Sequence, residues 1–451
     1  MRNLLRILSV VVVVFVMAAC GKSNDEPPMP VPPTPVPPPV RSYTIMTYGC
    51  GGGELDEFYE ATIKNVALLD VPPHINIVGQ MKWSNDYKSE WSAGDGGVTR
   101  FKYNHATAGF DNEPYGGNSF EIDNPSNLAE FITWAREEAP ADEYVIIFMG
   151  HGNAYHPSFD GATTRAIMRD DEEPVYLGLS GIAEAFRAAD AHFSLSFMMC
   201  CLMNSIEYIT ELEPYTDYYL ASSHVTSISG GEIYLILESL IGMEEYDEQS
   251  IVEAVMHYLD KDYDMWWSQN LLAIDHTLTK CSDVAALNDA IREFTDVVVA
   301  LYDEEMTIGA DAMLTRYGFT AADIDKTLGE AYYPVNASFS ESDIKALEWY
   351  RMDYAFEIVD IATKVAAATQ HSDVIRTAEN IKSAAAAAIT YQCDANLLAV
   401  ERVYYTALLV NQSQWASLGL ESAGYEDTMF DRTTGWSRLL KANNATYMHS
   451  R

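Results

Sequence analysis

Basic residues are scarce in this sequence. Its 451 residues include 28 lysines and arginines but 66 aspartates and glutamates, so the formal net charge is −38. Proteins that bind nucleic acid need a basic surface to displace the counterions of the phosphates. The composition therefore argues against nucleic acid as a partner. An acidic surface of this size favours solubility and can attract cationic substrates.

Cysteine is also scarce. The six cysteines include no CxxC pair and no Cys/His pair at the spacing of zinc ligands. Their number and wide spacing exclude a disulfide framework and argue against a structural zinc site. If Cys20 is acylated, five cysteines remain and at least one thiol is free. The five are Cys50, Cys200, Cys201, Cys281 and Cys393.

The apolar run at the N-terminus is too short to span a bilayer comfortably. It covers residues 7–17, follows Arg2 and Arg6, and precedes small residues, which is the pattern of an export signal. The sequence "MAAC" resembles a bacterial lipobox and implies that Cys20 is lipidated. We therefore expect anchoring in the bacterial cell envelope, outside the cytoplasm, either in the periplasm or at the surface. A plain secretory signal that is cleaved nearby is the alternative.

A proline-rich stretch follows the signal. The segment "PPMPVPPTPVPPP" holds nine of the eighteen prolines, and such a segment adopts extended polyproline II rather than a helix or strand. Its thirteen residues would form a spacer of about 40 Å. We divide the chain into a signal peptide (1–19), a Pro-rich linker (20–41), an α/β core (42–300) and a helix-rich C-terminal region (301–451).

Strands alternate with helical patterns through the first half of the chain. This alternation predicts a mostly parallel sheet with helices on both faces, followed by a helix-rich region. Ligands of such sheets bind at the carboxyl ends of the strands, where His151 and the Cys200–Cys201 pair fall. The expected strands cover residues 43–48, 75–83, 98–106, 144–150, 192–200 and 217–223, and residues 270–277 are a further strand that returns to the sheet.

Cys201 and His151 have the features of a catalytic pair. A cysteine nucleophile needs a lowered pKa, a base and donors for the oxyanion. Cys201 lies where a helix is predicted to begin, and exposed amides at a helix start favour the thiolate. His151 follows an apolar strand, and the backbone N–H groups of Gly152 and Cys201 could form the oxyanion hole. Taken singly, each side chain is also compatible with a structural role.

The segments "YVIIFMGHG" and "FMMCCLMNSIEY" resemble the clostripain family of cysteine peptidases, relatives of caspases and gingipains. The matching residues are His151–Gly152, Cys201–Met203, Glu207 and Ala221–Ser222, and the resemblance covers about residues 43–235. It implies a caspase-like fold and an endopeptidase that forms a thioester acyl-enzyme. It also implies protein or peptide substrates and no required cofactor. We expect a monomer.

The resemblance makes Cys201 the nucleophile, while strand alternation turns Cys200 toward the core. A vicinal disulfide between the two would silence the enzyme, and we do not expect one. Met199 stands where the family has an aspartate that binds Arg or Lys at the cleavage site. A thioether cannot pair with a guanidinium, so an apolar pocket is expected unless Asp170 or Asp171 supplies a charge.

Further expectations come from the resemblance. Ser222, at the end of a neighbouring strand, is another candidate pocket residue. Members of the family often mature by self-cleavage between the histidine and the cysteine, and Arg165 and Arg169 are candidate sites here. Calcium is possible because clostripain depends on it, but the sequence contains no DxDxDG-type loop.

Two other functions compete with a lipid-anchored endopeptidase. One is a surface binding lipoprotein that uses the aromatic-rich C-terminal half. The other is a catalytically inactive protein of the peptidase fold whose altered pocket serves recognition. The aromatic residues on which the first alternative depends are Trp266, Trp267, Trp349 and Trp415.

Overall fold

The computed structural model describes most of the chain after the linker. All described residues belong to one unit, Val40–Arg451, so the predicted signal peptide and nearly all of the predicted linker lie outside them. The described ranges are residues 41–53, 55–92, 97–152, 154–155, 167–170, 175–223, 232–241, 249–268, 276–331, 354–392 and 403–447. No helix among these residues is both long and apolar enough to span a membrane.

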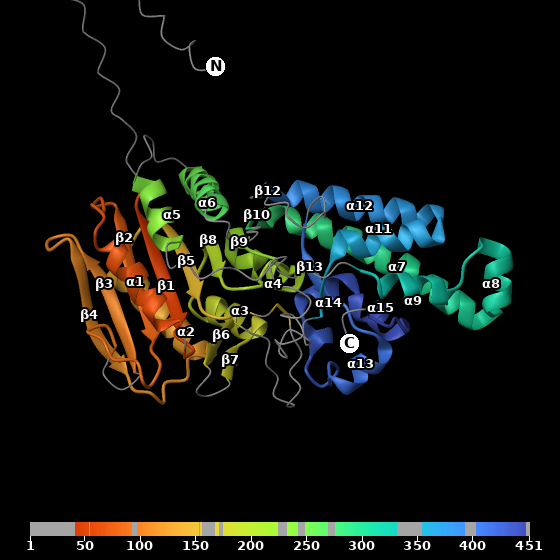
Figure 1. Cartoon of the computed structure of the whole chain (residues 1–451), viewed down its shortest axis with the longest axis horizontal. Helices are drawn as coiled ribbons and strands as arrows, with labels where there is room; N and C mark the ends of the chain where they lie inside the picture. Colours follow the sequence, from red (N-terminus) through yellow and green to blue (C-terminus); the bar gives the residue numbers. More distant parts are fainter. Residues whose placement is uncertain are drawn as a thin grey trace, which may run out of the picture. The chain divides into compact units, whose positions relative to one another are not determined.

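A nine-stranded sheet organises this unit, in the order β12-β10-β9-β8-β5-β1-β2-β3-β4 (Figure 1). Neighbours among β9, β8, β5, β1 and β2 are parallel, and an antiparallel pair continues the sheet at each edge. The strands are β1 (Tyr43–Cys50), β2 (Ile75–Lys82), β3 (Val98–Asn104), β4 (Gly109–Gly116), β5 (Glu143–Met149), β8 (Phe193–Met199), β9 (Thr216–Ala221), β10 (Thr277–Lys280) and β12 (Ile389–Gln392).

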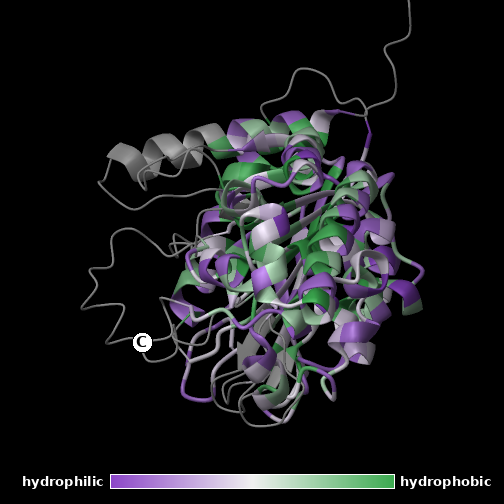
Figure 2. Ribbon diagram, turned by 90° about the vertical axis from the view of Figure 1, so that its right-hand side faces the viewer, coloured by the Kyte–Doolittle hydropathy of each residue, from purple (hydrophilic) through white to green (hydrophobic). Residues whose placement is uncertain are grey.

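The central strands are buried on both faces, as their continuous apolar runs predict. In β5, Ile146 and Phe148 pack with one hydrophobic cluster, and Val145 and Ile147 pack with the other. Figure 2 shows hydrophobic residues concentrated along the inner strands and the helix sides that cover them. The first cluster includes residues of α2 (Pro125–Glu138), α3 (Leu179–Ala188) and α4 (Ile206–Leu212), and the second includes residues of α1 (Asp56–Val66), α5 (Glu232–Ile241) and α6 (Ser250–Ser268).

The second half is rich in helices, as expected, and it extends the first hydrophobic cluster. A two-stranded antiparallel sheet of β11 (Ala355–Glu357) and β13 (Thr406–Leu408) lies among the helices. The predicted boundary at residue 300 remains a prediction, and it falls inside α7. The helices are α7 (Val284–Ile308), α8 (Ala310–Tyr317), α9 (Ala321–Leu328), α11 (Ile358–Thr369), α12 (Ser372–Ala388), α13 (Gln412–Ser417), α14 (Met429–Thr434) and α15 (Trp436–Ala442).

Several strands differ from the prediction. Most of the predicted strand 270–277 lies outside the described residues, and the described strand β10 begins at Thr277. Strand β4 was not expected, because its sequence "GFDNEPYG" contains few apolar residues and lies at the exposed edge of the sheet. The short pair β6 (Ile167–Asp170) and β7 (Val175–Leu177) occupies a region that the sequence predicts to be a polar loop.

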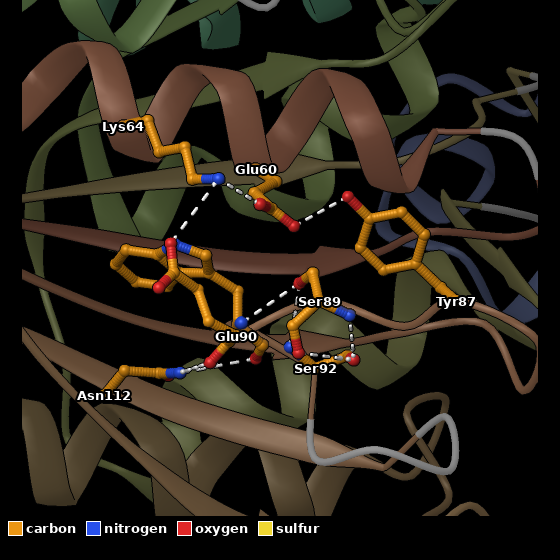
Figure 3. A network of polar contacts seen from close by, with 8 residues as sticks. Glu60, Lys64, Tyr87, Ser89, Glu90, Ser92 and Asn112 are labelled. Atoms are coloured by element: carbon orange, nitrogen blue, oxygen red, sulfur yellow. Dashed lines mark hydrogen bonds and ion pairs between the residues drawn. The ribbon is translucent and has the colours of Figure 1, made fainter.

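A polar network fixes the loop that follows β2 (Figure 3). Tyr87 donates a hydrogen bond to Glu60 of α1 at 2.6 Å, and Lys64 of α1 pairs with Glu60 at 2.5 Å and with Glu90 at 3.6 Å. Asn112 of β4 donates to the carbonyl of Glu90 at 3.3 Å. The loop is therefore tied to α1 and to the edge strand, which helps hold the carboxyl end of β2.

The packing around Gly79 of β2 generates a stability prediction. A Cβ at Gly79 would lie 2.1 Å from Cζ of Phe101 and 2.2 Å from Oγ1 of Thr47. Gly79→Ala should therefore lower the free energy of unfolding by about 1–3 kcal/mol through overpacking. Gly117→Ala is the control, because a Cβ there meets no atom within 4 Å. Urea unfolding measures both changes, and equal losses in the two variants would contradict the prediction.

Candidate active site

Residues 151 and 201 lie side by side at the carboxyl ends of two central strands of the sheet. Strands β5 and β8 are parallel, and Met149 pairs with Met199 at their carboxyl ends. His151 and Cys201 each follow two residues after this pair, and neighbouring strands are about 4.8 Å apart. The contact continues past them, because a Cβ at Gly152 would lie 2.4 Å from the carbonyl oxygen of Cys201. The structure thus places the segments that carry His151 and Cys201 next to each other, and the roles of base and nucleophile remain predictions.

The two adjacent cysteines have different environments. Cys200 is 1% exposed, belongs to the first hydrophobic cluster and donates a weak hydrogen bond to the carbonyl of Phe148 at 3.6 Å. Burial raises the pKa of the Cys200 thiol well above its usual range. Cys201 is partly exposed and packs against Ala154, Leu202 and Ala355. Cys200 therefore faces the core, as strand alternation predicts, and neither cysteine is part of a disulfide in this structure.

The turn after Cys201 corrects one expectation. The sequence predicts that a helix begins at Cys201, but α4 begins at Ile206. Leu202 has a φ of 60°, a left-handed conformation that costs a bulky residue about 1–3 kcal/mol and persists only where its surroundings enforce it. Residues 201–205, which we call the nucleophile turn, therefore separate the thiol from the helix. The prediction that a helix begins at Cys201 is therefore wrong, and the expected effect of a helix start on this thiol loses its basis.

Gly152 packs against the nucleophile turn. A Cβ there would also lie 2.7 Å from Cβ of Cys200 and 2.9 Å from Cγ of Met203. Only glycine allows this close approach of the segment after β5 to the segment after β8. The assignment of the Gly152 and Cys201 N–H groups as oxyanion donors remains a prediction.

The loop between β1 and α1 borders the other side of His151. Gly49 of β1 pairs with Met149, so Gly51 reaches the same level as His151. The carboxylate of Asp56 lies against Gly51 and accepts hydrogen bonds from the N–H and hydroxyl of Ser84, at 2.9 and 2.6 Å. Asp56 and Ser84 thus hold the loop that contains Gly51 in place. The sequence pattern did not predict a role for either residue, although a Gly-rich loop before an acidic helix start was a signal for them.

Three methionines form a row across the sheet at the level two residues before His151 and Cys201. Met81, Met149 and Met199 lie at one level of the sheet, with Gly49 between the first two. A Cβ at Gly49 would lie 2.5 Å from the sulfur of Met81 and 3.3 Å from Cβ of Met149, so glycine makes room for the Met81 sulfur. Met199 is partly exposed and packs against the second cluster. The side chains at this level beside Cys201 are therefore apolar and flexible.

The remaining predicted site residues are only partly described. Ser222 is fully buried at the end of β9, and its carbonyl accepts a hydrogen bond from the N–H of Asn204 at 2.9 Å. Arg169 and Asp170 belong to β6, which lies close to β1 and β5. The pocket and cleavage roles of these residues remain predictions. Cys20, Arg165 and Asp171 lie outside the described residues.

Comparison with known families matches this chain to one of them. The model of the clostripain family matches residues 116–411. The chain belongs to the clostripain family. The matched range includes both His151 and Cys201, and it extends well into the helix-rich second half. Membership makes the protein a cysteine peptidase with peptide or protein substrates, and the predicted resemblance is confirmed.

Solved structures of clostripain-type proteases share the fold. Two structures of a secreted C11 cysteine protease from Bacteroides thetaiotaomicron, one in complex with an irreversible peptide inhibitor, have TM-scores of 0.59 and 0.60 and identities of 13% and 14%. An inactive zymogen C11 protease from Parabacteroides distasonis has a TM-score of 0.59 and 13% identity. Each comparison covers 88% of this chain and 99% of the other. Comparison with curated proteins finds no match.

Glu207, the glutamate of the clostripain-like motif, is fully buried in the first turn of α4. Its carboxylate accepts hydrogen bonds from the N–H of Leu408 at 2.7 Å, the hydroxyl of Tyr425 at 3.1 Å and the hydroxyl of Ser205 at 2.5 Å. Burial raises the pKa of Glu207 above its usual value. Glu207 therefore fastens the helix after the nucleophile turn to residues about two hundred positions later.

The described residues contain no group of three or more His, Cys, Asp or Glu side chains that could hold a metal ion. The expectation that this clostripain-family protein requires no cofactor, with calcium as a possible ligand, remains a prediction.

The environment of Glu207 predicts a pH-dependent effect on stability. When the pKa of a carboxyl group is higher in the folded state than in the unfolded state, the free energy of unfolding falls as the pH rises above the unfolded pKa. Glu207→Gln can keep the contacts to Leu408 and Tyr425 without a charge, so its stability relative to the wild type should increase from pH 5 to pH 8. Glu207→Ala should cost about 1–3 kcal/mol, because a buried N–H loses its acceptor.

Urea unfolding at both pH values measures these differences. Glu253→Gln, at an exposed position of α6, is the control and should show no such change with pH. If the free energies of unfolding of Glu207→Gln and the wild type differ by the same amount at pH 5 and pH 8, the assignment of a raised pKa to Glu207 is contradicted.

Proposed function

We propose that this protein is an exported, lipid-anchored cysteine endopeptidase that uses Cys201 and His151 as a catalytic dyad. The observation that carries the proposal is their placement. Both follow two residues after the paired Met149 and Met199, at the carboxyl edge of the sheet. Cys201 is not part of a disulfide and is partly exposed, which supports access of a peptide from solvent.

The reaction proceeds by transfer of an acyl group to sulfur. The Cys201 thiolate attacks the peptide carbonyl, and backbone N–H groups of Gly152 and Cys201 stabilise the oxyanion. His151 gives its proton to the leaving amine, the C–N bond breaks, and a thioester remains. His151 then takes a proton from water, the resulting hydroxide attacks the thioester, and the carboxylic acid leaves as the thiolate is restored.

Export and anchoring are supported by the N-terminal sequence. The apolar run before "MAAC" directs export, Cys20 receives the lipid, and the Pro-rich linker holds the peptidase away from the membrane. Two structures of the same fold are described as those of a secreted protease. We place this protein outside the cytoplasm, in the periplasm or at the cell surface, as a monomer that requires no cofactor.

The methionine row supports an apolar preference at the cleavage site. Met199 lies two residues before Cys201, pairs with Met149 and brings no charge to pair with Arg or Lys. Flexible thioethers adapt to large apolar side chains such as those of leucine and methionine. Self-cleavage at Arg165 or Arg169 is not expected from such a pocket.

Substitution of the dyad tests the proposed chemistry. Cys201→Ala and His151→Ala should each lower kcat/KM on a peptide library by at least about 10³-fold, because either change removes the nucleophile or its proton carrier. Cys200→Ala is the matched control, and it should leave turnover almost unchanged because that thiol points into the core. Activity that survives in Cys201→Ala would refute the dyad. Peptide binding without turnover by the wild type would favour the inactive or binding alternatives.

Substitution of Met199 tests the specificity. The wild type should cleave after large apolar residues, and Met199→Asp should raise the ratio of kcat/KM for arginine over leucine at least about tenfold. Met199→Leu keeps the surface apolar and should preserve the wild-type preference. A wild-type enzyme that already prefers arginine would show that another group supplies the negative charge.

A further inference from the structure

Asn204 lies at a junction of three chain segments. It is the fourth residue of the nucleophile turn and is fully buried. Its side-chain Nδ2 donates to the hydroxyl of Ser223 at 2.9 Å and to the carbonyl of Tyr404 at 2.6 Å. Its backbone N–H donates to the carbonyl of Ser222 at 2.9 Å. One residue thus joins the nucleophile turn to the end of β9 and to the segment before β13.

The backbone carbonyl of Asn204 adds to this junction. It accepts hydrogen bonds from the N–H and the hydroxyl of Thr406, at 3.0 and 3.2 Å, and Ser205 bridges to Thr406 in parallel orientation. Tyr404 is held from its other side as well, because its N–H donates to the buried carboxylate of Glu357 at 3.4 Å. We call residues 403–408 the C-terminal strap.

The strap is also connected to the nucleophile turn through β11, the strand that pairs with β13. Ala355 of β11 pairs with Leu408 of β13. The same alanine packs with Leu202, against which the Cys201 side chain lies. Residues far later in the chain therefore pack against the nucleophile turn, at the left-handed Leu202 and beside Cys201. Such a conformation needs its surroundings to enforce it.

We infer that Asn204 is a positioning residue for the peptidase reaction, and that it makes the C-terminal strap part of the active site. By fixing the turn to the end of β9 and to the strap, it sets the position of the Cys201 sulfur relative to His151. This inference rests on the proposed function. Asn204 touches neither substrate nor the reacting atoms, so it acts through Cys201.

The chemistry of the amide defines what can replace it. The carbonyl of Tyr404 only accepts hydrogen bonds, so the nitrogen of Asn204 must face it. Among the described residues, Oδ1 of Asn204 is buried without a hydrogen-bond partner. The side chain therefore acts as a donor. Asn204→Asp keeps the shape but removes the donors and sets a carboxylate against a carbonyl oxygen.

A matched control exists in Asn443. It is also fully buried, and its Nδ2 donates to the carbonyl of Val410 at 2.9 Å and to that of Leu439 at 3.2 Å. Asn443→Ala removes the same kind of group from the C-terminal helices, outside the nucleophile turn. The changes in kcat and melting temperature of Asn443→Ala show what is lost when a buried asparagine has only a structural role.

The experiment compares four full-length proteins: the wild type, Asn204→Ala, Asn204→Asp and Asn443→Ala. We expect Asn204→Ala to lower kcat about 10- to 100-fold with KM little changed, because a small misplacement of a reacting group has an effect of this size. Asn204→Asp should be at least as impaired, and Asn443→Ala should keep its kcat. Melting temperatures establish that each variant is folded at the assay temperature.

Two readouts do not depend on turnover. The first is the rate of Cys201 alkylation by iodoacetamide, located by mass spectrometry, which should fall in both Asn204 variants and not in Asn443→Ala. The second is hydrogen exchange, which should become faster in the C-terminal strap of the Asn204 variants only. Unchanged alkylation and kcat in a folded Asn204→Ala protein would overturn the inference, as would full activity of Asn204→Asp.

The failure of the proposed function would give a different result. A wild type that cleaves no peptide refutes the endopeptidase proposal, while the alkylation and exchange measurements still decide whether Asn204 positions the thiol. A wild type that is active together with an equally active Asn204→Ala leaves the peptidase in place and removes only the positioning role.

Discussion

The parallel pairing of β5 with β8 sets Met149 opposite Met199, and the arrangement of the site depends on this alignment. Both strands end at the same edge, so the residues that follow them, His151 and Cys201, emerge side by side. A shift of one residue in either strand would turn its side chains to the other face. Hydrophobic clusters on both faces hold this register, because each strand buries alternate side chains in different clusters.

Beyond the sheet, the nucleophile turn depends on distant parts of the chain. Glu207 binds the N–H of Leu408, and Asn204 binds Tyr404 and Thr406. These contacts lie close in sequence to Leu202, whose left-handed conformation needs its surroundings to enforce it. The match to the clostripain family covers residues 116–411 and so includes both the nucleophile turn and the C-terminal strap.

Much of the architecture could be predicted from local sequence patterns. The continuous apolar run of β5 and the alternation of strands and helices predict a buried parallel sheet, and the rule for strand ends places His151 near Cys201. The start of α4 could not be predicted in this way. The sequence after Cys201 has helical periodicity, and contacts with distant residues, among them Ser222 and Thr406, hold residues 201–205 in a turn. Strand β4 was missed because its edge position removes the apolar pattern.

The central claim is that the Cys201 thiol, placed beside His151, is the nucleophile. The most direct measurement treats the purified mature protein with an irreversible thiol-reactive peptide inhibitor and maps the adduct by mass spectrometry. We expect one adduct, on Cys201, formed quickly in the wild type and much more slowly in His151→Ala. An adduct on Cys200 or another cysteine, or a folded protein that stays unmodified, would contradict the account.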